Sequence, residues 1–147
     1  MNIRSIRRSP GHVPHLLPAR RIGEAGSRSD CFAYLLLFVL PYFFDTKGID
    51  QFVLDYANRD MAGIEFLKNL PKDKDVQVGV LDIRTNAIET PEKVAARIRK
   101  VIAAVPPDRV ALSTDCGMKP LARMIAKMKL RALAEGAQIV RKELSGK

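Results

Sequence analysis

Short apolar runs and helical periods alternate along the chain from residue 49 onward. The runs Ile49–Ala57, Val76–Ile83 and Arg109–Asp115 are rich in β-forming side chains and are bounded by polar turns. This pattern predicts three strands. A polar side chain stands at or near the end of each run: Asp55, Asp82, and Asp115 with Cys116 after it. Residues able to take part in chemistry therefore lie at the strand ends.

Helical periods fill the intervals between these strands and follow the last one. We expect a short helix over Asp60–Leu70, with Met61, Ile64 and Leu67 facing inward. A second helix begins after Thr90, which can cap it, and continues to Val105.

The last helical period covers Lys119–Leu144, where we expect Gly136 to weaken or break the helix. Its inward face is predicted to include Met124 and Met128, as core packing. Arg97 of the preceding helix is assigned to a solvent-facing side, and Glu89 to the helix start.

The resulting order, β-α-β-α-β-α, predicts a parallel sheet with right-handed crossovers. Three units are too few for a closed barrel of eight. They fit either a fragment of such a barrel or part of an open sheet.

The chain before residue 49 has a different character. Residues 1–30 carry six arginines against two acids, have no sustained period, and are predicted to be an irregular basic leader. Cys31–Phe44 is a fourteen-residue apolar run with Pro41 inside it, and we interpret it as a buried helix opening a 31–147 domain. A membrane span needs about twenty residues, so no membrane segment is expected.

The net charge of +9 is concentrated at the two ends of the chain. Residues 119–147 carry eight basic side chains against two acids but no aromatic residue on which a base could stack. Nucleic-acid binding is therefore disfavoured, and a solvated helix face is preferred. Two cysteines are too few for a disulfide framework, which predicts a reducing, cytoplasmic setting.

Two of the strand-end residues can bind a metal together. Asp55 ends the first strand and Cys116 follows the third, so in a parallel sheet both lie on the same rim. A carboxylate and a thiolate are ligands that Zn²⁺ accepts. The alternatives are that Cys116 fills a small core space and that Asp82 and Asp115 cap the turns after their strands.

Three motifs give the chain a resemblance to the cobalamin-independent methionine synthase family, especially its shorter members. They are DQFVLDYANRDMAGIEFL, VGVLDIRTNAIETPEKVAARI and STDCGMK, in that order, within residues 49–144. The last motif is similar to the family's Asp-Cys-Gly-Leu-Lys signature, which holds a zinc-bound cysteine. The resemblance implies the last three units of a (β/α)₈ barrel.

The resemblance also implies roles for individual residues. Cys116 would be a zinc thiolate, and Asp55 falls where the family has an acidic zinc ligand, usually glutamate. Asp82 falls in the substrate-side loop, and Arg84 stands where larger members have a histidine that assists proton transfer. Asp115, together with the glycine after the cysteine, would shape the turn that presents the thiolate.

The family reaction moves a methyl group from a methylated folate to the sulfur of homocysteine. The resemblance therefore implies Zn²⁺ as cofactor and a homocysteine-like thiol and a methylated folate as small-molecule partners. The family's remaining zinc ligands, a His-x-Cys pair, have no counterpart at the corresponding distance upstream. His12, His15 and Cys31 are the nearest residues of suitable type, and we assign none of them as a ligand.

The sequence thus supports two interpretations. In the first, the chain is a carboxyl-terminal fragment of a zinc-dependent methyltransferase that is inactive alone. In the second, it is a basic α/β module without catalysis that binds a partner or self-associates through an unpaired sheet edge.

Overall fold

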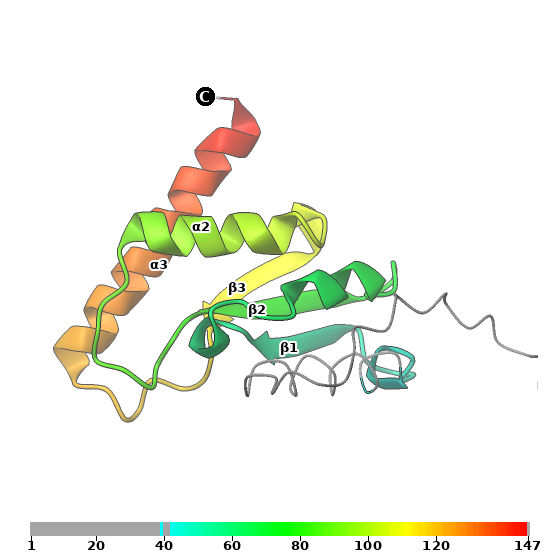
Figure 1. Ribbon diagram of the computed structural model, residues 1–147, viewed down its shortest axis with the longest axis horizontal. Coiled ribbons are helices and arrows are strands. Elements are labelled where there is room, and N and C mark those ends of the chain that lie inside the picture. The colour runs from blue at the N-terminus through cyan, green and yellow to red at the C-terminus, as the bar shows by residue number, and fades with distance from the viewer. Residues whose placement is uncertain (1–38, 40–41, 147) are drawn as a thin grey trace, which may run out of the picture.

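Three parallel strands form the centre of the protein. The computed structural model describes Val39 and residues 42–146. The strands are β1 (Gln51–Asp55), β2 (Asp75–Leu81) and β3 (Val110–Thr114), and they lie side by side in the order β1-β2-β3 (Figure 1). The predicted leader, and all but four residues of the predicted apolar helix, lie outside the described residues and stay predictions.

The register places the central strand β2 between two parallel neighbours. Leu54 pairs with Val78, which in turn pairs with Leu112. Val76, Val78 and Val80 are completely buried. A parallel strand with neighbours on both sides and helices on one face has to be apolar, and this accounts for the valine-rich sequence of β2.

The connection from β1 to β2 differs from the prediction. In place of a helix over 60–70, the chain forms two 3₁₀ segments, η1 (Ala57–Arg59) and η2 (Ile64–Asn69). The predicted helix was wrong because Asp60, Met61 and Gly63 adopt left-handed backbone conformations, with φ of 50°, 66° and 79°.

The inward face of this connection is nevertheless the predicted one. Met61 and Leu67 are at most 2% exposed, and Ile64 is 9% exposed. Burial of these three side chains therefore does not require an α-helix.

Helix α2 (Pro91–Ile102) begins as predicted. The side chain of Thr90 accepts a hydrogen bond from the Lys93 amide at 3.3 Å, which caps the helix. Val94 and Val101 are fully buried on its inner face. The assignment of Arg97 to the solvent side was wrong, because this side chain is only 6% exposed and points toward the end of the sheet.

After α2, the 3₁₀ segment η3 (Pro107–Arg109) leads into β3, and α3 (Arg123–Ser145) closes the described chain. Helices α2 and α3 pack against each other and cover one face of the sheet (Figure 1). Gly136 does not break α3. It lies at the crossing with α2, where an added Cβ would stand 2.8 Å from Val94 Cβ and from the Pro91 carbonyl oxygen.

The orientation of α3 corrects a further prediction. Met124 and Met128 are 67% and 46% exposed, so they are not core residues. The buried stripe of α3 instead passes through residues that are mostly small, together with one lysine: Lys129, Ala132, Gly136, Ala137 and Val140. Small side chains let the two helices approach closely, and this sets which side of α3 faces inward.

The opposite face of the sheet is less covered than the helix face. Val53 of β1 is 63% exposed. Its register partner Gln77 in β2, and Ala111 of β3, which pairs with Gln77, are only half-buried. In the part of the chain that the structure describes, no helix has both the length and the hydropathy needed to cross a membrane.

Candidate functional site

The carboxyl ends of the three strands bring the predicted site residues to one rim of the sheet. Asp55 is the last residue of β1, Asp82 directly follows β2, and Cys116 lies two residues after β3. Because the strands are parallel, these ends share an edge, which is where ligands bind in open and closed α/β sheets.

Asp55 is held by residues of the turn that follows it. Asn58 Nδ2 donates a hydrogen bond to Asp55 Oδ2 at 2.9 Å, and the Arg59 guanidinium lies 3.7 Å from Oδ1. The Asp55 side chain is 43% exposed. Its carboxylate is therefore oriented from one side and open to solvent on another, as a metal ligand or a hydrogen-bond acceptor has to be.

Cys116 is exposed and carries a free thiol, so it is not the core filler that one interpretation of the sequence assumed. The hydroxyl of Thr114 donates a hydrogen bond to the Cys116 carbonyl oxygen at 2.7 Å, which shapes the turn after β3. A Cβ added to Gly117 would have no neighbour within 4 Å, so no close approach requires glycine at that position.

Asp115 lies in the centre of the rim. Its carboxylate accepts hydrogen bonds from three consecutive backbone amides of the segment after β1: Tyr56 at 3.1 Å, Ala57 at 3.0 Å and Asn58 at 2.7 Å. The prediction that Asp115 caps the turn after its own strand was wrong, because its carboxylate caps the segment that follows β1 instead. Burial raises the pKa of Asp115, and the three amides oppose that effect.

Asp82 and Arg84 occupy the loop between β2 and α2. Asp82 Oδ1 accepts a hydrogen bond from the Arg84 amide at 2.9 Å, which is the local cap that the sequence offered as an alternative. Arg84 is exposed, so its guanidinium can meet a ligand at the rim.

A buried charged cluster that the sequence analysis missed lies beneath this loop. Glu89 Oε2 accepts a hydrogen bond from Lys129 at 2.7 Å. Glu89 Oε1 accepts from the Asp82 amide at 3.0 Å and lies 3.4 Å from the Arg97 guanidinium. Arg97 also donates to the Val80 carbonyl oxygen at 2.8 Å. The cluster joins β2, the loop, α2 and α3.

Opposing effects act on the pKa of Glu89. Burial alone would raise it, but the hydrogen bonds from Lys129 and from the Asp82 amide outweigh burial and lower it overall. One sequence signal for the cluster existed. Lys129 falls three residues before Ala132 and seven before Gly136, on the stripe that faces inward, where an unpaired lysine would be costly.

The rim does not contain a complete zinc site by itself. Zinc in proteins takes at least three protein ligands, in tetrahedral arrangement. Among the described residues no three His, Cys, Asp or Glu side chains are grouped so that they could hold a metal ion. Asp55 and Cys116 carry side chains of types that zinc binds, a carboxylate and a thiol, so these two described residues fit part of a zinc site.

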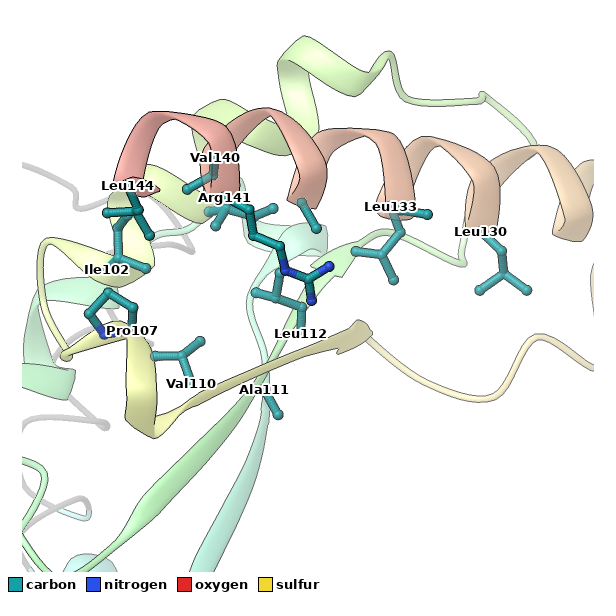
Figure 2. Close-up of a pocket in the computed structure, with 13 residues that line it drawn as sticks. Ile102, Pro107, Val110, Ala111, Leu112, Leu130, Leu133, Val140, Arg141 and Leu144 are labelled. Carbon is teal, nitrogen blue, oxygen red and sulfur yellow. The ribbon is translucent and has the colours of Figure 1, made fainter. Parts of the chain in front are cut away.

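The structure also has an apolar groove away from the rim. This groove of about 480 Å³ runs between α2, α3 and β3, and Figure 2 shows Leu112 and Val110 on one wall with Leu133 and Leu144 on the other. Arg141 reaches across it (Figure 2). The rim residues Asp55, Asp82, Asp115 and Cys116 do not line this groove.

Comparison with known proteins identifies the class to which this fold and rim belong. The sequence profile of the cobalamin-independent synthase catalytic domain matches residues 44–139. The chain belongs to this family of catalytic domains. The match includes β1, β2 and β3 and most of α3, and so contains Asp55, Asp82, Arg84, Asp115 and Cys116.

Particular relatives are methionine synthases. The chain is 38% identical over 112 residues to the methionine synthase of Thermococcus kodakarensis, and 40% identical over 110 residues to that of Saccharolobus solfataricus. These alignments cover 76% and 75% of the chain but 33% of each relative. The chain thus spans about a third of the length of these relatives.

A solved structure agrees with these matches. The B12-independent methionine synthase from Shewanella sp. W3-18-1, determined in complex with selenomethionine, superposes with a TM-score of 0.69 at 34% identity. The superposition covers 80% of this chain and 36% of that one. The resemblance inferred from the three sequence motifs is confirmed, as is the α/β fold with a parallel sheet.

Proposed function

We propose that the chain supplies the last three βα units of a (β/α)₈ catalytic barrel that transfers a methyl group to a thiol. The proposed donor is a methylated folate and the proposed acceptor is homocysteine or a similar small thiol. Family membership supports the reaction class, and the similarity to methionine synthases supports the substrates. The two cysteines of the chain support a reducing, cytoplasmic setting.

The observation that carries the proposal is the arrangement of β1, β2 and β3. Asp55 ends β1 and Cys116 follows β3, the two strands that flank β2, so both lie at the same rim of the parallel sheet. We assign Cys116 and Asp55 as partial zinc ligands, and Asp82 and Arg84 as residues that face the substrates. Further ligands would have to come from outside the described residues.

Two surfaces support the placement of these units within a larger barrel. The sheet face that carries Val53 is only partly covered, as the inner face of an incomplete barrel would be. The apolar groove beside β3 has the character of a surface that another βα unit covers (Figure 2). We therefore expect no turnover from the isolated chain, because two ligands rarely hold zinc and much of the substrate pocket is missing.

The alternative is a basic module without catalysis that self-associates or binds a partner. The same groove and sheet edge favour it, since apolar surfaces of this kind promote association. The two proposals differ in what they require of Cys116, which matters only to the first.

Reconstitution distinguishes them. The chain is mixed with a companion polypeptide, the part of the Thermococcus kodakarensis methionine synthase that precedes the matched region. Zinc content and formation of methionine from homocysteine and a methylated folate are then measured. We expect about one zinc per complex and methionine formation, both lost in Cys116→Ala and kept in the matched control Cys31→Ser.

A complex that binds no zinc, or that keeps zinc and activity in Cys116→Ala, would contradict the methyltransferase proposal. Failure to bind the companion, together with a stable dimer of the chain alone, would favour the module.

A further inference from the structure

The side chain of Asp115 joins segments that are far apart in sequence. Its carboxylate accepts from the amides of Tyr56, Ala57 and Asn58, which lie 57 to 59 residues earlier in the chain. Its own amide donates to the Leu81 carbonyl oxygen of β2 at 3.0 Å. A single residue after β3 is thereby bound to the ends of both other strands.

The middle strand is shaped to let this side chain pass. Gly79 of β2 pairs with Asp55 of β1 on one side and with Ser113 of β3 on the other. A Cβ built on Gly79 would overlap the Asp115 carboxylate and lie 2.8 Å from Asp115 Cα. The missing side chain at 79 is therefore what allows the Asp115 carboxylate to reach the segment after β1.

The two ends of this connection are next to the two proposed ligands. Asp115 directly precedes Cys116, and Tyr56 directly follows Asp55. We propose that Asp115 is a positioning residue, which holds the segment carrying Cys116 in fixed relation to the segment carrying Asp55. The assignment of those two residues as ligands rests on the proposed function, but the connection itself does not.

The neighbouring strand end provides the contrast. Asp82 stands at the corresponding place after β2, yet its carboxylate accepts from the Arg84 amide, two residues away. Asp82 caps its own turn, whereas Asp115 binds a different strand's segment. An Asp82→Ala variant therefore removes a rim carboxylate without removing a connection between strands.

The test compares amide hydrogen exchange, read by nuclear magnetic resonance, in Asp115→Asn and Asp115→Ala. Oδ1 serves Tyr56 and Ala57, and Oδ2 serves Asn58. Asparagine keeps only one accepting oxygen, so we expect the Asn58 amide to exchange about tenfold faster while the other two stay protected. In Asp115→Ala all three amides exchange about tenfold faster or more.

A spectroscopic readout then asks whether the Cys116 segment responds. A nitroxide is attached to Cys116 in a Cys31→Ser background, and its electron paramagnetic resonance line shape is recorded. We expect Asp115→Ala to shorten the rotational correlation time of the label by about twofold or more. Asp82→Ala leaves the line shape unchanged.

One result would overturn the proposal: in Asp115→Ala the amides of residues 56–58 exchange faster but the line shape of the label at Cys116 is unchanged. Asp115 would then only cap the segment after β1. Uniform acceleration of exchange throughout α2 and α3 in Asp115→Asn would also overturn it, because that is general destabilisation. Both measurements use the isolated chain without zinc or substrate. Failure of the reconstituted methyl transfer leaves them unaffected, so the two proposals can fail separately.

Discussion

The ammonium group of Lys129 lies 2.7 Å from the Glu89 carboxylate, and the two side chains are 0% and 5% exposed. Lys129 also donates to the carbonyl oxygens of Asp82, at 2.8 Å, and Ala87. The N-terminal part of α3 is therefore attached to both ends of the loop that carries Asp82 and Arg84. The rim loop after β2 depends on a helix 40 residues further along the chain.

Replacing Lys129 with methionine should destabilise the protein strongly. The substitution leaves the buried Glu89 carboxylate without its closest partner, and breaking a buried pair in this way costs about 3–5 kcal/mol. Urea denaturation followed by circular dichroism measures the loss. Lys127→Met is the matched control, because Lys127 is exposed on the same helix, and it should change the unfolding free energy by less than about 0.5 kcal/mol. Equal effects at 127 and 129 would contradict the importance of the cluster.

The pH dependence of stability should report on Glu89. Its pKa is lowered in the folded protein, below the ordinary value of 4.5, so the unfolded state binds the proton more readily. The stabilisation is complete above that ordinary value and is lost as the pH falls through the lowered folded pKa. Urea midpoints measured between about pH 7 and pH 3 should decline more steeply in the wild type than in Glu89→Gln. Parallel curves for the two proteins would show that Glu89 contributes no such dependence.

Gly136→Ala should destabilise the protein although alanine favours helices. In an exposed helix the change would add about 1 kcal/mol of stability. Here the new methyl group would press against Val94 and the Pro91 carbonyl at 2.8 Å, and such overpacking costs about 1–3 kcal/mol. The melting temperature shows whether Gly136→Ala stabilises or destabilises the protein. Gln138→Ala, on the exposed side of α3, is the control for helix propensity. A higher melting temperature for Gly136→Ala would show that the two helices can separate at little cost.

Gly79→Ala should reproduce the loss of the Asp115 connection without altering Asp115. The added methyl group would occupy the place of the Asp115 carboxylate, so the amides of residues 56–58 should lose protection together. We expect a loss of about 1–3 kcal/mol in unfolding free energy as well. Gly117→Ala is the control, since a Cβ there meets nothing within 4 Å, and it should be near neutral. If the amides of residues 56–58 stay protected from hydrogen exchange in Gly79→Ala, the Asp115 carboxylate reaches them without the space at Gly79, which would contradict this prediction.

Runs of β-forming residues and helix-capping residues predicted the elements that they mark directly. The valine-rich run of β2 and the Thr90 cap with Pro91 after it place a strand and the start of α2 within a residue or two. The helix predicted over 60–70 was wrong because the apolar spacing there indicates only that Met61, Ile64 and Leu67 are buried. The observed 3₁₀ connection buries the same three side chains. Asp60 and Met61 adopt left-handed backbone conformations, which the spacing of apolar residues does not predict.

The sequence predicted which residues lie at the rim, because it predicted where the three strands end. Asp55, Asp82 and Cys116 follow three strands, and parallel order puts them on one edge. The partners of the Asp115 and Lys129 side chains were not predictable, because these side-chain hydrogen bonds connect residues 40 to 59 positions apart. Such partners depend on how three strands and two helices meet.

The sequence by itself determined the alternation of strands and helices, the polar ends of the strands and the motifs of the family. These are properties of neighbouring residues, whose spacing and side-chain chemistry act over one or two turns of chain. Only the tertiary structure decided that Gly79 leaves room for Asp115, that Gly136 is a crossing point, and that Lys129 and Arg97 are buried. Those outcomes depend on close packing between distant segments, where a single methyl group or an unpaired charge changes the free energy by more than local preferences do.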